Sequence, residues 1–234
     1  MSAPRRFHKH AGVAEVAAGF GVTLDARALK TPAGAGFVVP TRALAEACAE
    51  EWNAQGKHII PASMPLTQLV FAALDGGEGA RAVRIAYILK FAETDLCCHR
   101  AEAPAALVAR QAAAWDPLVA WGEAALGARL PVVVGVIAAE VGAGAFDALR
   151  SHAVAVDDFR LTALTHTAAL AGSVLIGFAL LRARLSAEAA FTAAALDELW
   201  SLEHWGEDAE ARGKLMGLRR ELSAVAGFIQ ALSA

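Results

Sequence analysis

The stretch Gly36–Trp52, GFVVPTRALAEACAEEW, contains the change of pattern that decides the fold class. The residues up to Pro40 are rich in short alternating apolar runs and glycines, which are typical of strands joined by turns. From Thr41, which can cap a helix, the chain continues in long helical periods. We therefore predict an α+β fold, with a small β-rich N-terminal subdomain (residues 1–40) followed by a larger α-helical subdomain (residues 41–234).

Four segments of the first subdomain alternate as short strands do, so that one face can be buried. In chain order they are RFHKH, VAEVAA, FGVTLDARALKT and GFVVP. Asp25 and Ala26 are expected at a tight turn inside the third segment.

The second subdomain is expected to consist mainly of helices. The first of them begins at Thr41, the second opens at Ser63 and Pro65, and the fourth starts at Pro104 and is interrupted or kinked at Pro117. Further helices are expected over residues 146–156, 159–181, 186–205 and 209–232. The β-branched stretch Leu130–Ile137, LPVVVGVI, is short and reads as a lone strand or an extended connector.

Composition excludes one class of partner. The 234 residues include 21 Lys and Arg against 24 Asp and Glu, a formal net charge of -3. A nucleic-acid binder would carry a broad excess of basic residues, so we expect no nucleic-acid partner. Hydrophobic residues make up 56% of the chain, but much of that share is Ala, which favours helix and costs little when exposed.

The cysteines and the N-terminal residues indicate the compartment. Cys48, Cys97 and Cys98 are an odd number, and adjacent cysteines are poorly placed to bridge each other, so a reducing compartment fits best. The first residues run into the charged RRFHKH without the apolar core of a secretory signal. We therefore expect a cytoplasmic protein, or one that has already been processed.

One uncharged stretch could in principle cross a membrane. Leu161–Leu181 meets the length of roughly 20 residues that a bilayer span requires. Its threonines, His166, Ser173 and small residues instead favour close packing against other helices. We predict a buried central helix rather than a stable membrane insertion, with the membrane span as the alternative.

The stretch Leu196–Ala211, LDELWSLEHWGEDAEA, sets two tryptophans among six carboxylates without a Lys or Arg to pair with them. Leu196, Trp200, Glu203 and Glu207 recur at helical spacing, so carboxylates interrupt an otherwise apolar stripe. Such a stripe is typical of a surface that faces a partner. Equally, the tryptophans could anchor the core while the acids form a solvated face.

Catalytic and cofactor motifs are missing. The chain has no Walker phosphate loop, no GxSxG, no HExxH, no GxGxxG after a strand and no CxxC pair. Cys97, Cys98 and His99 point in different directions and have no second ligand cluster at matching spacing, which disfavours a metal site. The competing hypothesis of a small-molecule enzyme would need a closed pocket, for example around Thr94, Asp95 and His99.

Seven blocks follow one another in a recognisable order: RRF, LDARALKTPA, VPTRALAEACAEEW, PASMPLTQL, ETDLCCHRAE, RQAAAWDPL and LWSLEHWGED. In these blocks the chain resembles the assembly chaperone family for the alpha subunit of the F-type ATP synthase catalytic head. The resemblance implies a protein that binds the unassembled alpha subunit, prevents its aggregation and hands it over to the beta subunit. It implies no enzyme activity and no cofactor.

The resemblance also indicates which residues bind the partner. The family's WGED-type block falls on residues 205–208, and the acidic residue before it falls on Glu203, the strongest candidate. Trp200, Trp205, Asp197 and Glu207 are the other candidates. The Ala-rich composition suggests a bacterial, cytoplasmic member; a processed eukaryotic member would lie in the mitochondrial matrix. The chain departs from the family at Ala26, where Gly usually follows the Asp.

Overall fold

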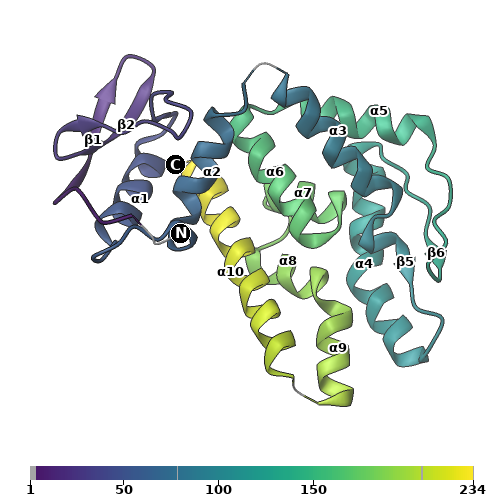
Figure 1. The fold of residues 1–234 in the computed structure, drawn as a ribbon. Helices are drawn as coiled ribbons and strands as arrows, with labels where there is room; N and C mark the ends of the chain where they lie inside the picture. Colours follow the sequence, from purple (N-terminus) through teal and green to yellow (C-terminus); the bar gives the residue numbers. More distant parts are fainter. Residues whose placement is uncertain (1–3, 78, 207, 234) are drawn as a thin grey trace. The chain divides into compact units, whose positions relative to one another are not determined.

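The computed structural model of the chain describes residues 4–77, 79–206 and 208–233 (Figure 1). Four short strands come first and helices dominate the rest, which confirms the α+β fold class. The chain forms two compact units: unit 1 contains Met1–Ala80 and Gly227–Ala234, and unit 2 contains Arg81–Ala226. The strands of the first sheet end before Pro40, while the predicted division into domains at this residue stays a prediction.

Unit 1 is built around a small antiparallel sheet. Its strands are β1 (Ala11–Val16), β2 (Gly19–Leu24), β3 (Arg27–Ala28) and β4 (Val38–Val39). The central strand β2 pairs with all three others, with Ala11 opposite Leu24 in the β1–β2 hairpin and Phe20 opposite Val39 of β4. Gly19 is required at the start of β2, because a Cβ atom there would lie 2.3 Å from the carbonyl oxygen of Val39.

The segment RFHKH is not a strand, so that prediction is wrong. Its side chains hold it to the residues around the end of the first helix instead. His8 is buried with Nε2 3.1 Å from the carbonyl oxygen of Trp52, and the Arg6 guanidinium donates to the carbonyls of Asn53 and Gln55. The alternating pattern of RFHKH therefore comes from a segment with one buried histidine, His8, and not from a strand paired in a sheet.

The helices of unit 1 begin as the sequence predicts. They are α1 (Arg42–Asn53), a 3-10 turn (Pro61–Ser63) and α2 (Pro65–Leu74). The Thr41 hydroxyl accepts from the Leu44 amide at 3.3 Å and donates to the carbonyl of Ala231 at 2.6 Å. Leu44, Cys48 and Trp52 of α1 are all buried, and α1 packs on β1 and β2.

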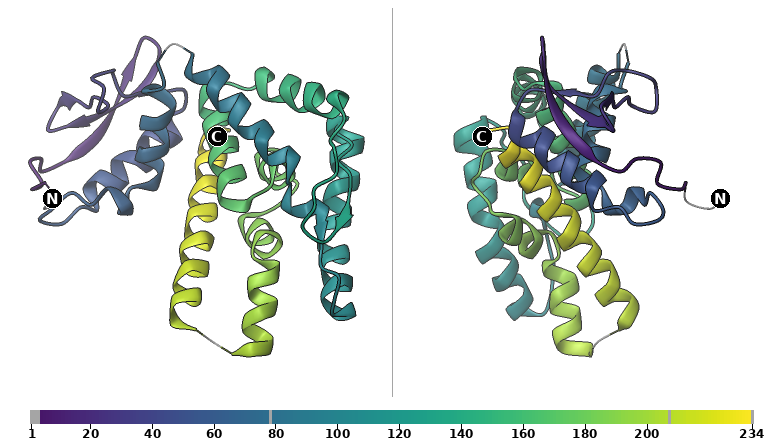
Figure 2. Two further views of the ribbon diagram at one scale, coloured as in Figure 1. Left: turned by 45° about the vertical axis from the view of Figure 1, so that its right-hand side comes forward. Right: turned by 90° about the vertical axis from the view of Figure 1, so that its left-hand side faces the viewer.

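Unit 2 contains most of the helices (Figures 1 and 2). They are α3 (Ala80–Glu93), a 3-10 turn (Leu96–Cys98), α4 (Ala105–Leu126), α5 (Ala143–Ala155), α6 (Asp158–Ala171), α7 (Val174–Leu181), α8 (Ala187–Ala194), α9 (Leu196–Trp205) and most of α10 (Ala209–Ala231). Two short strands, β5 (His99–Arg100) and β6 (Val133–Val134), pair in parallel. The helix α4 runs through Pro117 without a break, so the predicted interruption is wrong, while the alternative of a kink stays a prediction. Figure 2 shows α9 and α10 running in opposite directions.

The uncharged stretch 161–181 forms two helices and not one. Gly172, with φ 62°, ends α6 in the left-handed conformation, and Ser173 caps α7 by accepting from the Ile176 amide at 3.0 Å. The carboxylate of Asp95, which is buried, accepts from the Ser173 hydroxyl at 2.7 Å and from the Leu175 amide at 3.1 Å. Within the described residues, no helix combines the length and the apolar character that crossing a bilayer demands.

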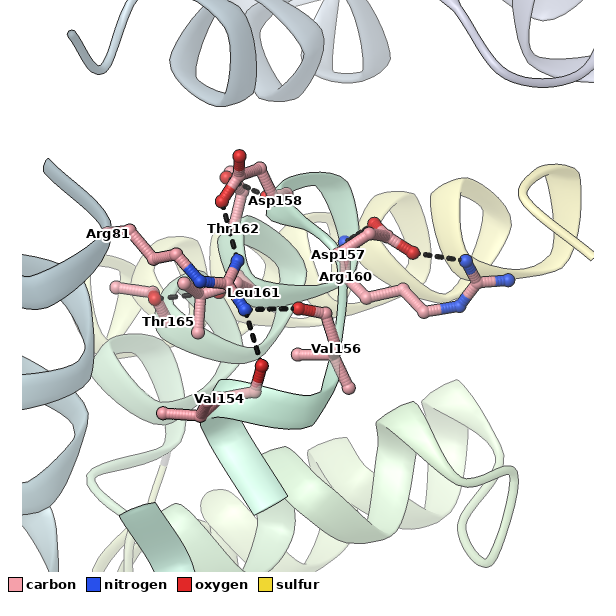
Figure 3. Close-up of polar contacts among 9 residues, drawn as sticks. All are labelled: Arg81, Val154, Val156, Asp157, Asp158, Arg160, Leu161, Thr162 and Thr165. Carbon is pink, nitrogen blue, oxygen red and sulfur yellow. Dashed lines mark hydrogen bonds and ion pairs between the residues drawn. The ribbon is translucent and has the colours of Figure 1, made fainter. Parts of the chain in front are cut away.

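A single arginine joins α3 to the corner between α5 and α6 (Figure 3). Arg81 lies 2.7 Å from Asp158 and donates to the carbonyls of Val154 at 2.7 Å and Val156 at 2.5 Å. Asp157 caps α6 by accepting from the Arg160 amide at 2.8 Å. The corner thus has its free carbonyls and its helix N-terminus satisfied by side chains.

Candidate functional site

The acidic stretch predicted to bind a partner forms α9, one helix of unit 2. Leu196 and Trp200 on one side of α9 are buried, whereas Glu198, Glu203 and Trp205 are exposed. The described part of the predicted stripe is therefore amphipathic, with Leu196 and Trp200 in the core and Glu203 at the surface.

Glu203 has a specific partner on α4. Arg110 Nη1 lies 2.5 Å from Glu203 Oε2, and Nη2 lies 3.0 Å from Oε1, so the pair is bidentate. The Arg110 hydrogen bond holds the pKa of Glu203 below its ordinary value, and the same bond raises the pKa of Arg110. About half of the Glu203 side chain remains exposed, so the carboxylate stays accessible to a partner.

Asp197 is positioned by the next residue of α4. The side-chain amide of Gln111, which is buried, donates to Asp197 Oδ1 at 2.8 Å, while its carbonyl oxygen accepts from the backbone amide of Ala101 at 2.8 Å. Gln111 thereby joins α9 to the segment that follows β5. Consecutive residues of α4 thus hold the two α9 carboxylates at their positions.

Trp200 and Trp205 have different environments. Trp200 is buried and stacks on His204 with ring centroids 3.9 Å apart, and Arg110 lies 5.9 Å from its ring centroid. Trp205, at the end of α9, is 78% exposed. Trp200 therefore supports the helix, while Trp205 offers apolar contact area. The fifth predicted residue, Glu207, lies outside the described residues.

The stretch Leu196–Ala211 contains no Lys or Arg of its own, but its acids have basic partners outside it. Partners come from other helices and from later in the chain. Besides the Arg110–Glu203 pair, Lys214 lies 2.8 Å from Glu210, and just before the stretch Arg219 lies 2.7 Å from Glu188 of α8. Arg110 and Gln111 were not predicted as site residues, although both begin the block RQAAAWDPL, because contacts between distant helices are not visible in local spacing.

An open pocket of about 400 Å³ lies beside Asp197. Its lining residues include Glu102, Asp197, Arg100 and Val136. Arg100 is buried and pairs with Asp116 at 2.7 Å, which leaves two carboxylates and an exposed valine for a surface that meets basic and apolar groups together.

The enzyme hypothesis requires Thr94, Asp95 and His99 to surround one pocket, but of these three only His99 lines the pocket beside Asp197. Asp95 is fully occupied in capping the 3-10 turn and α7, and burial raises its pKa. His99 lines the pocket beside Asp197, but its Nδ1 is 3.2 Å from the carbonyl oxygen of Gly135. Among the described residues, no group of three or more His, Cys, Asp or Glu side chains is arranged to hold a metal ion.

Comparisons with known proteins agree with these features. The family described as "ATP12 chaperone protein" matches residues 5–123. The crystal structure of Atp12 from Paracoccus denitrificans is 35% identical, covers 98% of each chain and superposes with a TM-score of 0.90. A putative chaperone from Agrobacterium tumefaciens is 37% identical over 98% of this chain and 86% of its own, with a TM-score of 0.91. This chain is a member of the ATP12 chaperone family.

Proposed function

We propose that this protein binds the unassembled alpha subunit of the F-type ATP synthase, prevents its aggregation and hands it over to the beta subunit. Family membership supports the chaperone role. The observation that carries the proposal for the site is the half-exposed Glu203 carboxylate, fixed in place by Arg110 on the surface of unit 2.

The physical task explains the mixed character of this surface. An unassembled subunit exposes apolar area that is later buried in the ring, and that area aggregates unless it is covered. The cover must be displaced by the final partner, so its affinity has to stay moderate. Carboxylates on α9 orient and steer a basic client surface, while aromatic side chains supply contact area.

The five residues predicted from the sequence have distinct roles in this proposal. Glu203 and Asp197 contact basic groups of the client, and the exposed Trp205 packs on its apolar surface. Trp200 acts indirectly, because it is buried and fixes the orientation of α9. Glu207, which lies outside the described residues, is proposed as a further acidic contact.

We assign this protein no catalytic step and no cofactor. Capture and release of a client need no chemical step. The chaperone only has to bind the alpha subunit more weakly than the beta subunit does. The compartment in which the alpha subunit is assembled is the expected location: the cytoplasm for a bacterial protein, or the mitochondrial matrix for a processed eukaryotic one.

Co-expression tests the proposal. The alpha subunit of the same organism is produced with and without this chain, and its soluble fraction and co-purification are measured. We expect a soluble complex that releases the alpha subunit when purified beta subunit is added. An alpha subunit that stays insoluble and forms no complex would contradict the proposal.

A further inference from the structure

The connection between α4 and α5 exposes a run of large apolar side chains. Val132, Val134, Val136 and Ile137 are 47%, 67%, 93% and 84% exposed. We call residues 131–139 the apolar loop. Single exposed apolar residues are common on protein surfaces, but a contiguous run of them marks an interaction site or an aggregation hazard.

The apolar loop is held in a defined conformation. Its strand β6 pairs with β5, the Gly135 amide donates to the carbonyl of Arg100 at 2.8 Å, and His99 Nδ1 lies 3.2 Å from the Gly135 carbonyl oxygen. The preceding Leu130 is buried. In the view of Figure 1, β6 lies next to β5 at the outer edge of unit 2. Fixed presentation lowers the entropy cost of binding, which suits a docking surface better than a loose connector.

Gly135 shows how closely this loop approaches an acidic residue. It has φ 86°, and a Cβ atom there would lie 3.2 Å from Glu102 Oε1. Glu102 and Val136 also line the pocket beside Asp197. The apolar loop and the acidic side of α9 are therefore parts of one continuous surface of unit 2.

Because the apolar loop adjoins the acidic side of α9, the surface fits a partner that presents apolar and basic groups side by side. Surfaces buried between permanent subunits have an apolar centre with charged residues towards the rim. A client surface of that kind with basic groups at its rim would place its apolar centre on the valines and its cations on Asp197, Glu102 and Glu203.

We infer that the apolar loop is the hydrophobic half of the client-binding surface, and that it covers apolar area on the same subunit whose basic residues meet α9. The inference rests on the proposed function and deepens it. It assigns partner contacts to Val134, Val136 and Ile137, for which the sequence patterns indicated only a strand or a connector.

The test compares two double variants of the full chain. Val136→Ser with Ile137→Ser removes apolar area from the loop. The matched control, Val83→Ser with Val154→Ser, removes it from exposed positions on α3 and α5, where the side chains are 70% and 55% exposed. Thermal unfolding shows that each variant folds, since exposed substitutions change stability little.

Affinity for the purified alpha subunit is then measured for all three proteins. The loop variant should bind roughly tenfold more weakly or worse, because two apolar contacts are lost, while the control stays within about twofold of the parent. Equal binding by the parent and the loop variant would overturn the inference and leave the proposed function standing. A parent protein that does not bind the alpha subunit would overturn both.

Sedimentation velocity tests whether the apolar loop binds a second copy of the chain instead of the alpha subunit. If the parent self-associates, the loop variant does not, and both bind the alpha subunit equally, the apolar loop is a contact between copies and the inference is wrong.

Discussion

Arg110 of α4 binds both carboxylate oxygens of Glu203 of α9, 93 residues further along the chain. The carboxylate predicted to contact a client therefore already has a partner inside the protein. Because the Arg110 and Glu203 side chains are 35% and 51% exposed, solvent screens the pair and its contribution to stability is small. Under the proposed function, a cation on the client would share or replace Arg110 at little cost to the fold.

The titration of Glu203 should report this pair directly. In the folded protein the hydrogen bond from Arg110 keeps the pKa of Glu203 below its ordinary value of 4.5. Since the folded-state pKa is lowered, the stabilisation is complete above the ordinary pKa and is lost as the pH falls through the folded value. Carboxyl-carbon NMR should show the lowered pKa in the parent and a return towards 4.5 in Arg110→Gln. An identical pKa in both proteins would exclude the pair in solution.

The serine that caps α7 should matter more than the one that caps α8. Ser173 is fully buried and binds both the Ile176 amide and the Asp95 carboxylate. Ser173→Ala should lower the free energy of unfolding by roughly 2–4 kcal/mol, since a cap and a bond to a buried carboxylate are lost together.

Ser186 is the matched control for that substitution. It caps α8 at an exposed position, with a single bond of 3.2 Å from the Ala189 amide. Ser186→Ala should cost about 1 kcal/mol or less. Equal losses in the two variants, measured by urea unfolding, would show that the Asp95–Ser173 contact adds nothing.

Replacing Ala26 should stabilise the sheet of unit 1. Asp25 and Ala26 join β2 to β3 with φ of 48° and 66°, a conformation that glycine adopts without strain and alanine does not. Ala26→Gly should raise the free energy of unfolding by roughly 1 kcal/mol. Ala18→Gly, at the β1–β2 turn where φ is not positive, should be neutral or slightly destabilising. A destabilised Ala26→Gly would contradict the turn geometry.

The three cysteines should resist alkylation in the folded protein. Cys48, Cys97 and Cys98 are all buried, and burial raises the pKa of the Cys98 thiol to about 12. The reactive thiolate is therefore scarce at pH 8 and also inaccessible. Mass spectrometry after iodoacetamide treatment should find no modification in the native protein and three modifications in urea. Rapid native labelling of any cysteine would show that its site opens.

The fold class, the turn at Asp25 and the start of α1 at Thr41 could be predicted because each depends on local patterns: alternation, turn residues and a helix cap. The division of residues 161–181 could not. The run is uncharged throughout, so no change of periodicity marks a boundary, and the bond from Ser173 to Asp95, which is distant in sequence, is not visible in local spacing. Likewise, the alternating pattern of RFHKH could not be distinguished from that of a strand, because the packing of His8 against Trp52 involves residues far apart in the chain.

The candidate site was predictable only in part. The acids and tryptophans of α9 were visible as a local cluster, but their environments depend on α4. Nothing in local spacing indicates that Arg110 pairs with Glu203, that Trp200 is buried while Trp205 is exposed, or that Val136 lies beside Asp197. These relationships arise from helix packing between residues far apart in the chain.

The central claim is that the Glu203 carboxylate contacts the client itself. Glu203→Gln removes the charge and keeps the shape, whereas Arg110→Gln breaks the same internal pair and leaves the carboxylate free. Measuring the affinity of both variants for the alpha subunit separates contact with the client from support of α9. We predict that Glu203→Gln binds about tenfold more weakly, while Arg110→Gln binds at least as well as the parent. Equal weakening in both variants, with equally lowered melting temperatures, would show that the pair only supports the fold and would contradict the account.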